Sequence, residues 1–283
     1  MQFFETSRQI QAACREVRRE GRTLGFVPTM GALHEGHLSL VRIARSQCDT
    51  VAVSIFVNPL QFGPAEDFSR YPRTFDEDCR KLVAEGVELL FAPGTEEMYP
   101  TGACTTVYVE GLSEKLDGKS RPGHFRGVST VVAKLFEIVH PDRAFFGQKD
   151  AAQVAVLRKM VSDLNMDVEI VVCPIVREAD GLAMSSRNRY LSPEERRHAL
   201  VLYRTLSCVR DLVSRGERDA SKVIATAAEV IANEPGVRLD YFAIVNPDTL
   251  DPVSDVSQAA LVAVAAWVGN TRLIDNLLLP ANS

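Results

Sequence analysis

Between residues 7 and 173, segments with helical periodicity alternate with short apolar segments of strand length. The apolar segments are residues 23–27, 50–57, 88–91, 144–147 and 168–173, and each is apolar at successive rather than alternate positions. Strands that are apolar on both faces need cover on both faces, which is typical of a parallel sheet between two layers of helices. We therefore predict a doubly wound, Rossmann-like α/β domain, with ligands beyond the carboxyl ends of its strands.

The pattern changes after about residue 176. Ser192, Pro193 and Glu195 form a helix start in which Ser192 caps the helix and Glu195 closes a capping box. Two helices follow, and then three apolar segments at residues 238–245, 259–268 and 272–279. Helices grouped before adjacent strands indicate a small α+β domain. We therefore predict two domains, residues 1–175 and a lid-like domain at 176–283.

Composition excludes several classes of protein. The formal net charge of -5 has no offsetting basic cluster, which argues against a nucleic-acid partner. The six cysteines are scattered without a C-x-x-C pair, as expected of reduced thiols rather than disulfides or a zinc site. The first residues lack a signal-peptide pattern, and no apolar run approaches the roughly 20 residues of a membrane span. We expect a cytoplasmic enzyme that does not associate with a membrane.

The strongest chemical signal is the segment 28–37, Pro-Thr-Met-Gly-Ala-Leu-His-Glu-Gly-His. It follows a predicted strand and opens a predicted helix, where free backbone N–H groups and the helix dipole attract phosphate. Gly31 and Gly36 let a nucleotide approach the backbone closely. His34 and His37 are three residues apart, so both rings can donate hydrogen bonds to charge that develops on a departing pyrophosphate. The segment predicts a nucleotide site.

Two other interpretations of the histidines remain open from spacing alone. They could be a zinc pair or histidines of the core. Catalytic zinc sites prefer H-E-x-x-H on a continuous helix with a third ligand, and Gly36 between these two histidines disfavours that arrangement.

A second motif, Met184-Ser185-Ser186-Arg187-Asn188, follows the predicted parallel domain. H-x-G-H after the first strand, combined with a later serine- and arginine-containing loop, resembles the signature of the nucleotidyltransferase superfamily. Members of that superfamily direct attack on the α-phosphate of a nucleoside triphosphate. Two motifs in this order are more specific than either alone.

Five further stretches narrow the resemblance. Residues 53–62, 70–74, 121–128, 146–150 and 177–184 together resemble the pantothenate synthetase (pantoate–β-alanine ligase) family, and residues 265–267 and 272–276 do so weakly. The resemblance implies that pantoate attacks ATP to give pantoyl adenylate and pyrophosphate, and that β-alanine then displaces AMP. It also implies a homodimer. Magnesium takes few protein ligands, so we expect Mg²⁺ to arrive with the ATP phosphates rather than in a site made by the protein.

The resemblance carries roles onto individual residues. His37, His34, Lys149 and Arg187 are the expected catalytic residues, with His37 as proton donor to the departing phosphate. Neutral amides suit the hydroxyls and carboxylate of pantoate, and the expected substrate-binding residues are Asn58, Gln61 and Gln153. The expected ATP-binding residues are Met30, Gly31, Ala32, Leu33, His34, Glu35, Gly36, His37, Gly147, Gln148, Lys149, Asp150, Val176, Met184, Ser185, Ser186 and Arg187.

Each of these positions also has a purely structural interpretation. Lys149 could be a surface lysine after a strand, Asp150 a helix N-cap, and the serine-rich loop a polar turn between domains. Arg121, His124 and Arg126 could gate the phosphates or lie on the surface. Asp76, Glu77 and Asp78 could bind Mg²⁺, but we favour a structural role, since acidic residues stabilise a helix start and Thr74 with Glu77 predicts a capping box there.

Two rival functions remain. Another enzyme of the superfamily, forming a dinucleotide-like product, would keep both motifs without needing Asn58, Gln61 and Gln153. A non-catalytic nucleotide-binding protein is the other, although His37, Lys149 and Arg187 are all present. The sequence departs from the family pattern at Ala151 and Ala152, where a bulkier residue and a glutamine are common.

Overall fold

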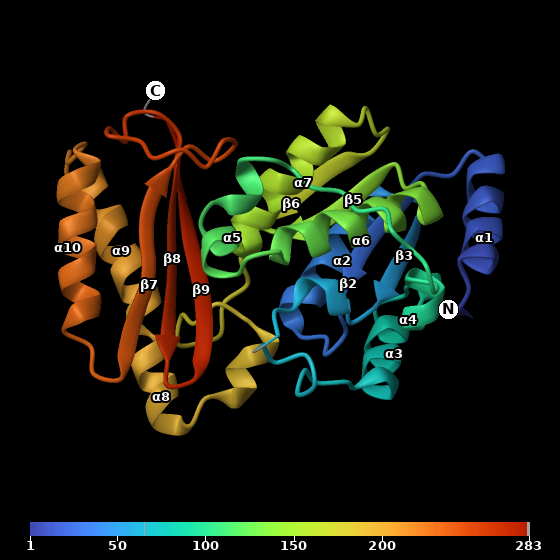
Figure 1. The fold of residues 1–283 in the computed structure, drawn as a ribbon, viewed down its shortest axis with the longest axis horizontal. Helices are drawn as coiled ribbons and strands as arrows, with labels where there is room; N and C mark the ends of the chain where they lie inside the picture. Colours follow the sequence, from blue (N-terminus) through green and yellow to red (C-terminus); the bar gives the residue numbers. More distant parts are fainter. Residues whose placement is uncertain (65, 282–283) are drawn as a thin grey trace.

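The computed structural model describes residues 1–64 and 66–281, which form two lobes (Figure 1). In the first lobe, strands and helices alternate along the chain. The strands are β1 (Gln2–Phe4), β2 (Leu24–Thr29), β3 (Thr50–Ile55), β4 (Leu89–Phe91), β5 (Arg143–Gly147) and β6 (Glu169–Cys173). The helices are α1 (Ser7–Arg19), α2 (Glu35–Gln47), α3 (Phe75–Ala84), α4 (Thr95–Met98), α5 (Asp117–Ser120), α6 (His124–Val139) and α7 (Ala151–Asp163).

These strands form one sheet in the order β1-β4-β3-β2-β5-β6, and every described pairing in it is parallel. From β2 the chain builds outward through β3 and β4, and then returns to place β5 on the other side of β2. The carboxyl ends of β2 and β5 are thus neighbours at the point where the strand order reverses. Such a switch point is where open α/β sheets bind ligands. The predicted α/β class is confirmed.

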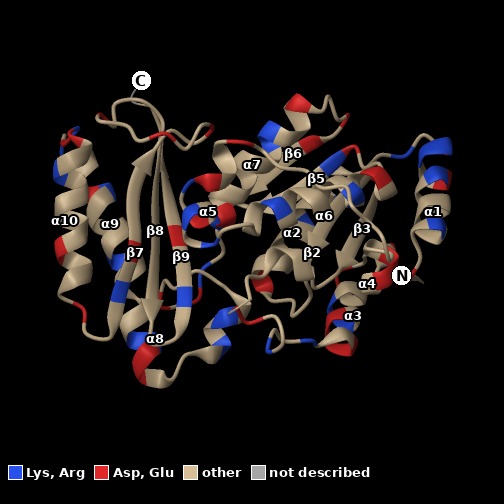
Figure 2. Ribbon diagram, in the orientation of Figure 1, with Lys and Arg blue, Asp and Glu red and all other residues tan. Residues whose placement is uncertain are grey.

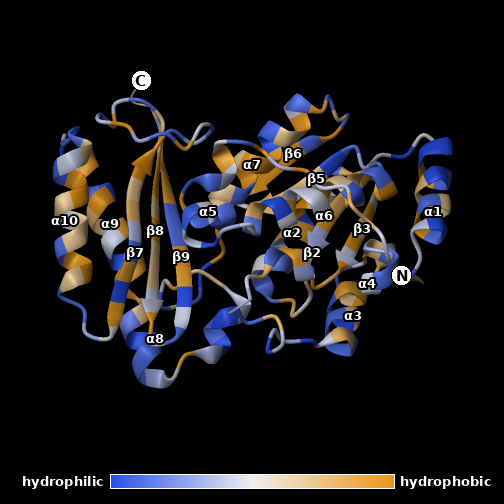
Figure 3. Cartoon of the chain, in the orientation of Figure 1, coloured by the Kyte–Doolittle hydropathy of each residue, from blue (hydrophilic) through white to orange (hydrophobic). Residues whose placement is uncertain are grey.

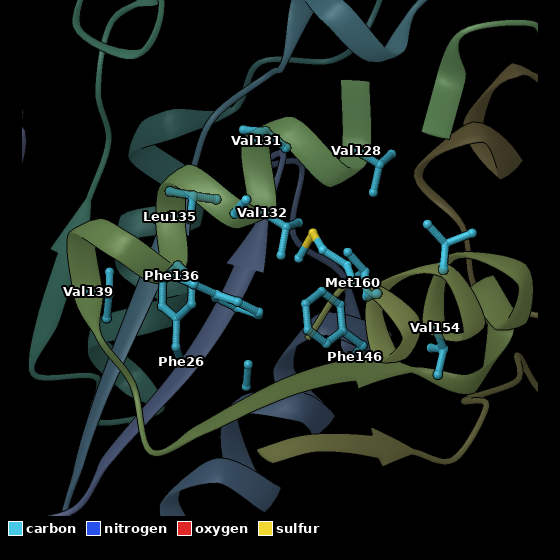
Figure 4. Close-up of a cluster of buried hydrophobic side chains, with 14 of the residues drawn as sticks. Phe26, Val128, Val131, Val132, Leu135, Phe136, Val139, Phe146, Val154 and Met160 are labelled. Carbon is cyan, nitrogen blue, oxygen red and sulfur yellow. The ribbon is translucent and has the colours of Figure 1, made fainter. Parts of the chain in front are cut away.

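Successive residues of the central strands enter two different cores, which explains why the sequence shows no alternation of apolar and polar positions. Phe26 packs in the core under α1, α6 and α7, whereas Val27 packs in the core under α2 and α3. Figure 4 shows the first core, where Phe26, Phe136 and Phe146 lie among the valines of α6. Strands β2 and β3 carry no Lys, Arg, Asp or Glu (Figure 2), and the central strands are strongly hydrophobic (Figure 3).

The second lobe contains η4 (Ser186–Tyr190), a 3-10 helix, and the helices α8 (Pro193–Ala199), α9 (Val201–Ser214) and α10 (Ala220–Ala232). Its strands β7 (Val237–Val245), β8 (Ala260–Val268) and β9 (Thr271–Leu279) pair antiparallel, and α9 and α10 cover one side of them (Figure 1). The predicted α+β character is confirmed. The predicted capping box of Ser192 and Glu195 is also present. The domain boundary at residue 175 stays a prediction.

Ion pairs join the two lobes beside β9. Arg272 on β9 pairs with Asp117 of α5 at 2.7 Å and with Asp240 of β7 at 2.8 Å. The hydroxyl of Tyr241 donates to the same Asp117 carboxylate at 3.2 Å. Because Arg272 is largely buried, this cluster fixes α5 against the second sheet. Among the described helices, none is long and apolar enough to cross a membrane.

Helix α6 begins at His124, because Gly123 adopts a left-handed φ of 85° and turns the chain directly before it. One local prediction is wrong. The capping box of Thr74 and Glu77 does not form: Thr74 donates its hydroxyl to Asp78 at 3.2 Å, and Glu77 instead pairs with Lys81 at 2.7 Å.

Candidate active site

The loop between β2 and α2 is tightly folded. Gly31 has a φ of 82° and Ala32 a φ of 51°, so two successive residues adopt left-handed conformations. A Cβ at Gly31 would lie 3.0 Å from the Ile55 side chain, closer than such contacts normally allow. Glycine at position 31 therefore serves both the backbone turn and the close approach to β3. The loop delivers His34 to the N-cap position of α2.

Asp78 stabilises this loop by accepting hydrogen bonds from its backbone. Its buried carboxylate accepts hydrogen bonds from the backbone N–H groups of Ala32 and Leu33, each at 2.8 Å. Lys81, one turn further along α3, donates to the carbonyl oxygen of Leu33 at 2.6 Å. A carboxylate that accepts two buried N–H groups makes strong charge-assisted hydrogen bonds. Sequence reasoning missed this role, and no local signal distinguishes Asp78 from Asp76.

The two histidines of the loop lie against each other. Their ring centroids are 4.1 Å apart, and Nδ1 of His37 faces the backbone N–H of His34 at 3.4 Å. Burial, and secondarily the Lys149 cation, lowers the pKa of His34 to about 4. Burial, then His34 and Lys149, holds the pKa of His37 well below its usual value. Both rings are therefore neutral at pH 7, and His37, accepting at Nδ1, carries its proton on Nε2.

Lys149 lies in η3 (Gln148–Asp150), a short 3-10 helix directly after β5. Its ammonium group is 3.8 Å from the Asp150 carboxylate and only partly exposed. Asp150 occupies the N-cap position of α7 but makes no capping hydrogen bond with its side chain, so that structural interpretation is not supported. Both side chains remain available to a ligand at the switch point.

The second motif faces the first across a cavity. Met184, Ser185, Ser186 and Arg187 line the same hollow as His34 and His37, although the two segments are about 150 residues apart in the chain. The other residues around this hollow are Met30, Gly36, Leu40, Tyr71, Gly147, Lys149, Asp150, Pro174, Ile175 and Val176. The structure thus brings together most of the residues predicted to bind ATP. Gly31, Ala32, Leu33, Glu35 and Gln148 belong to the supporting segments instead.

An ion pair with Asp67 of the first lobe holds Arg187 in the lining of this cavity. Its guanidinium makes two hydrogen bonds to the Asp67 carboxylate, at 2.9 and 3.0 Å. Next to it, Ser186 and Tyr71 share a hydrogen bond of 3.2 Å between their hydroxyls. Arg187 is therefore oriented before any ligand arrives, and Asp67 is a contact that the sequence did not suggest.

A second cavity adjoins the first. Asn58, Gln61 and Gln153, the predicted substrate-binding amides, all line it. Several residues line both this cavity and the first one, which we call the nucleotide-side cavity: Met30, His37, Leu40, Tyr71, Gly147, Asp150 and Arg187. Apolar side chains of α6, such as Val128 and Val131, form another part of its wall. A small ligand with polar and branched apolar parts fits such a lining.

Arg121 and His124, at the start of α6, also line the second cavity. The Nδ1 of His124 lies 2.8 Å from the carbonyl oxygen of Gln61, and its Nε2 lies 3.0 Å from Arg121. Since both neighbours fix the tautomer, His124 donates from Nδ1 and accepts at Nε2. Burial, then the Arg121 cation, lowers the pKa of His124 to about 4. Arg121 also pairs with Glu66 at 2.5 Å, whereas Arg126 stacks over the Tyr108 ring outside the cavities.

Within residues 1–64 and 66–281, no three or more His, Cys, Asp or Glu side chains lie close enough together to bind a metal ion. In particular, the hydrogen bonds of Asp78 go to the backbone of the motif loop and to Thr74.

Comparison with known proteins places this geometry in context. The family model described as pantoate-beta-alanine ligase matches residues 2–278. A pantothenate synthetase of Koribacter versatilis is 60% identical over 281 residues, covering 99% of this chain and 97% of the relative. A crystal structure of pantothenate synthetase from Thermus thermophilus superposes with a TM-score of 0.93 at 50% identity, covering 98% and 99% of the two chains. A pantoate-beta-alanine ligase from Francisella tularensis, complexed with beta-gamma ATP and beta-alanine, has a TM-score of 0.80 at 33% identity, with 98% and 97% covered.

Proposed function

This chain belongs to the pantoate-beta-alanine ligase family, and we propose that its two adjoining cavities carry out the reaction of that family. The protein is a ligase that condenses pantoate with β-alanine to pantothenate, using ATP and passing through pantoyl adenylate. The observation that carries the assignment of the site is the convergence of two distant motifs, with His34, His37 and Lys149 facing Ser185 to Arg187 across one hollow. The Francisella relative, complexed with beta-gamma ATP and beta-alanine, supports the choice of ligands.

In the first step, a carboxylate oxygen of pantoate attacks the α-phosphorus of ATP and pyrophosphate leaves. A carboxylate is already ionised at pH 7, so this step needs no general base. The protein has to align the two reactants and stabilise the charge that moves onto pyrophosphate. Residues such as His37 and Asp150 line both cavities, so the pantoate carboxylate in one cavity would lie near the α-phosphorus of ATP in the other.

Lys149 and the histidines would stabilise the departing pyrophosphate. Lys149 supplies an ammonium group, and neutral His37 offers its Nε2–H as a hydrogen-bond donor. Negative charge developing nearby favours the protonated imidazole, so the pKa of His37 rises as pyrophosphate forms. Arg187 and Ser185 would approach the phosphates from the opposite side, with Arg187 exchanging its contact to Asp67 for a phosphate oxygen.

In the second step, the uncharged amine of β-alanine attacks the acyl carbonyl of the adenylate. The carbon–nitrogen bond forms as the carbon–oxygen bond to AMP breaks, and the amine loses a proton. Gln61 and Gln153 border the space where this carbonyl would lie. Water would hydrolyse the adenylate, so the reaction benefits from an enclosed site.

Closure of the second lobe over ATP would provide that enclosure. The Met184–Arg187 segment belongs to the part of the chain assigned to the lid and already faces the histidines. A smaller radius of gyration in small-angle scattering with a non-hydrolysable ATP analogue would support closure, and identical profiles would contradict it.

Mg²⁺ and the homodimer complete the proposal. Magnesium suits the ATP phosphates, since it usually keeps several waters and takes few protein ligands. The homodimer and the cytoplasmic location are expected from the family, and sedimentation and cell fractionation respectively would test them.

Oxygen-18 in the pantoate carboxylate tests the adenylate route. The proposal predicts one labelled oxygen in AMP and the other retained in the amide carbonyl of pantothenate, as read by mass spectrometry. Label in inorganic phosphate, together with ADP, would instead show an acyl phosphate and refute the proposed use of this site. A product that retains the adenylyl group would favour the dinucleotide-forming rival.

A further inference from the structure

The side-chain amide of Asn58 makes four hydrogen bonds, two at its oxygen and two at its nitrogen. Its Oδ1 accepts from the Tyr99 hydroxyl at 2.9 Å and from the backbone N–H of Leu60 at 3.3 Å. Its Nδ2 donates to the carbonyl oxygen of Gly127 at 3.0 Å and to Oε1 of Gln61 at 3.1 Å. The residue is 1% exposed, so these four contacts use the capacity of the amide.

The orientation of this amide is fixed by groups that cannot exchange roles. The N–H of Leu60 can only donate, and the carbonyl oxygen of Gly127 can only accept. Turning the Asn58 amide over would set two donors against each other at Leu60 and two acceptors against each other at Gly127. Unpaired buried polar groups are costly, so only one orientation is stable.

The position of Gly127 allows this arrangement. A Cβ built there would lie 2.3 Å from the carbonyl oxygen of Leu60, which no side chain could accommodate. Helix α6 therefore packs directly onto the backbone of η1 (Pro59–Gln61), the segment that carries Gln61. The contact between Asn58 and Gly127 is a consequence of this close approach.

Tyr99 supplies the shortest of the four contacts and secures the amide from the side of α4. Its hydroxyl donates to Asn58, and its ring packs near Phe56 and under the Lys134 ammonium group. Burial raises the pKa of the Tyr99 hydroxyl far above its usual value, so it remains a donor throughout the physiological range.

The fixed orientation of the Asn58 amide also determines how the side-chain amide of Gln61 is oriented. Because Oε1 of Gln61 accepts from Asn58, its Nε2 is the end left for the cavity. There, the one acceptor that Nε2 meets among the described residues is the weak acceptor Sδ of Met30, at 3.0 Å. A ligand that meets Gln61 at this atom has to bring an acceptor, such as a carboxylate or hydroxyl oxygen. An ammonium group would meet two N–H donors.

We propose that Tyr99 is a positioning residue which, through Asn58, holds the amide nitrogen of Gln61 toward the substrate and so makes this contact selective for an oxygen acceptor. The inference rests on the proposed function, in which this cavity takes pantoate. Asn58 thereby acts on the substrate through Gln61, rather than by contacting it.

Steady-state kinetics of Tyr99→Phe test the proposal, with Tyr108→Phe as the matched control. The Phe variant keeps the ring and removes one hydroxyl, whereas Tyr108 is an exposed tyrosine whose hydroxyl bonds only Glu114 among the described residues. Loss of one hydrogen bond that orients Gln61 predicts about a fivefold rise in the KM for pantoate, with the KM for ATP unchanged. An unchanged KM for pantoate, or an equal rise in both KM values, would overturn the proposal.

A double-mutant cycle separates action through Asn58 from simple packing. If Tyr99 acts through Asn58, Tyr99→Phe has no further effect on the KM for pantoate in an Asn58→Ala background. Full additivity of the two changes would contradict the relay. Should Asn58→Ala not fold, the KM comparison for Tyr99→Phe alone decides. Wild-type protein whose turnover ignores pantoate would refute the proposed function itself, a result distinct from any of these.

Discussion

Asn276, on the last strand of the chain, donates its side-chain amide to the backbone carbonyl oxygen of Lys149 at 2.9 Å. The same amide nitrogen reaches the carbonyl oxygen of Gln148 at 2.9 Å, and the Gln148 side chain donates back to Oδ1 of Asn276 at 3.0 Å. The neighbouring Asp275 pairs with Arg177 at 2.6 Å and lines a pocket together with Lys149 and Asp150. Strand β9 therefore positions the turn that carries the proposed phosphate-binding lysine, although it belongs to the other lobe.

Removing this support should impair catalysis more than folding. Asn276→Ala leaves two backbone carbonyls without their donor and lets Lys149 shift, and we expect kcat to fall roughly tenfold because small misplacements weaken charge stabilisation. Steady-state kinetics and a thermal melt would measure this. Asn270→Ala, at an exposed position in the turn before β9, is the control and should keep wild-type kcat. Equal kcat in both variants would show that Lys149 does not depend on Asn276.

Removing the side chain of Lys149 or of His37 should slow the adenylation step. His37→Ala or Lys149→Ala should each raise the barrier of the adenylation step by about 2–4 kcal/mol, the scale for one charge-stabilising group. Pyrophosphate release in single-turnover experiments reports that step. Lys159→Ala, which removes an exposed lysine paired with Asp163, should have no effect. Unchanged adenylation in either site variant would exclude the assigned role.

Asp78 should be essential to the shape of the motif loop. In Asp78→Asn, one of the two backbone N–H groups now bound by the carboxylate meets an amide donor instead. We expect a loss of about 1–3 kcal/mol in the free energy of unfolding and a higher KM for ATP. Urea denaturation and kinetics would measure both. Asp76→Asn, on an exposed residue two positions earlier, should change neither, and identical behaviour of the two variants would remove the special role of Asp78.

The histidines predict how stability depends on pH. Burial lowers the pKa of both His34 and His124 to about 4, whereas in the unfolded chain each has a pKa of about 6.5. Between these values the unfolded state binds more protons than the native state, so stability rises with pH. This contribution is complete above about pH 6.5 and is lost as the pH falls toward 4.

Urea denaturation of the substrate-free protein at several pH values between about 7 and about 4.5 would measure this loss. His37, whose pKa is also held well below its usual value, contributes in the same direction, so His124→Asn removes one of three such histidines and the dependence of the unfolding free energy on pH should be shallower. A slope equal to that of the wild type would mean that His124 is not held neutral by the fold.

The fold class could be predicted from the sequence because the strands of a buried parallel sheet are apolar on both faces. Phe26 and Val27 enter different cores, so both had to be apolar. The two motifs could be recognised because each is contiguous in the chain. The short edge strand β1 gave no comparable signal, since its three residues remain partly exposed.

The supporting contacts could not be predicted because each joins residues far apart in the chain. Asp78 is 46 residues from Ala32, Tyr99 is 41 from Asn58, and Asn276 is 127 from Lys149. The local pattern around Thr74 was misleading for the same reason. A capping box was expected, but Asp78, required by the motif loop, takes the Thr74 hydroxyl instead.

The central claim is that these cavities form an acyl adenylate before the amide. Pyrophosphate release from ATP and Mg²⁺, measured with pantoate and β-alanine each omitted in turn, tests it most directly. The account predicts that release requires pantoate, proceeds for about one turnover without β-alanine, and becomes continuous with AMP formation when β-alanine is added. Release that is indifferent to pantoate would leave the nucleotide site standing and contradict the assigned reaction.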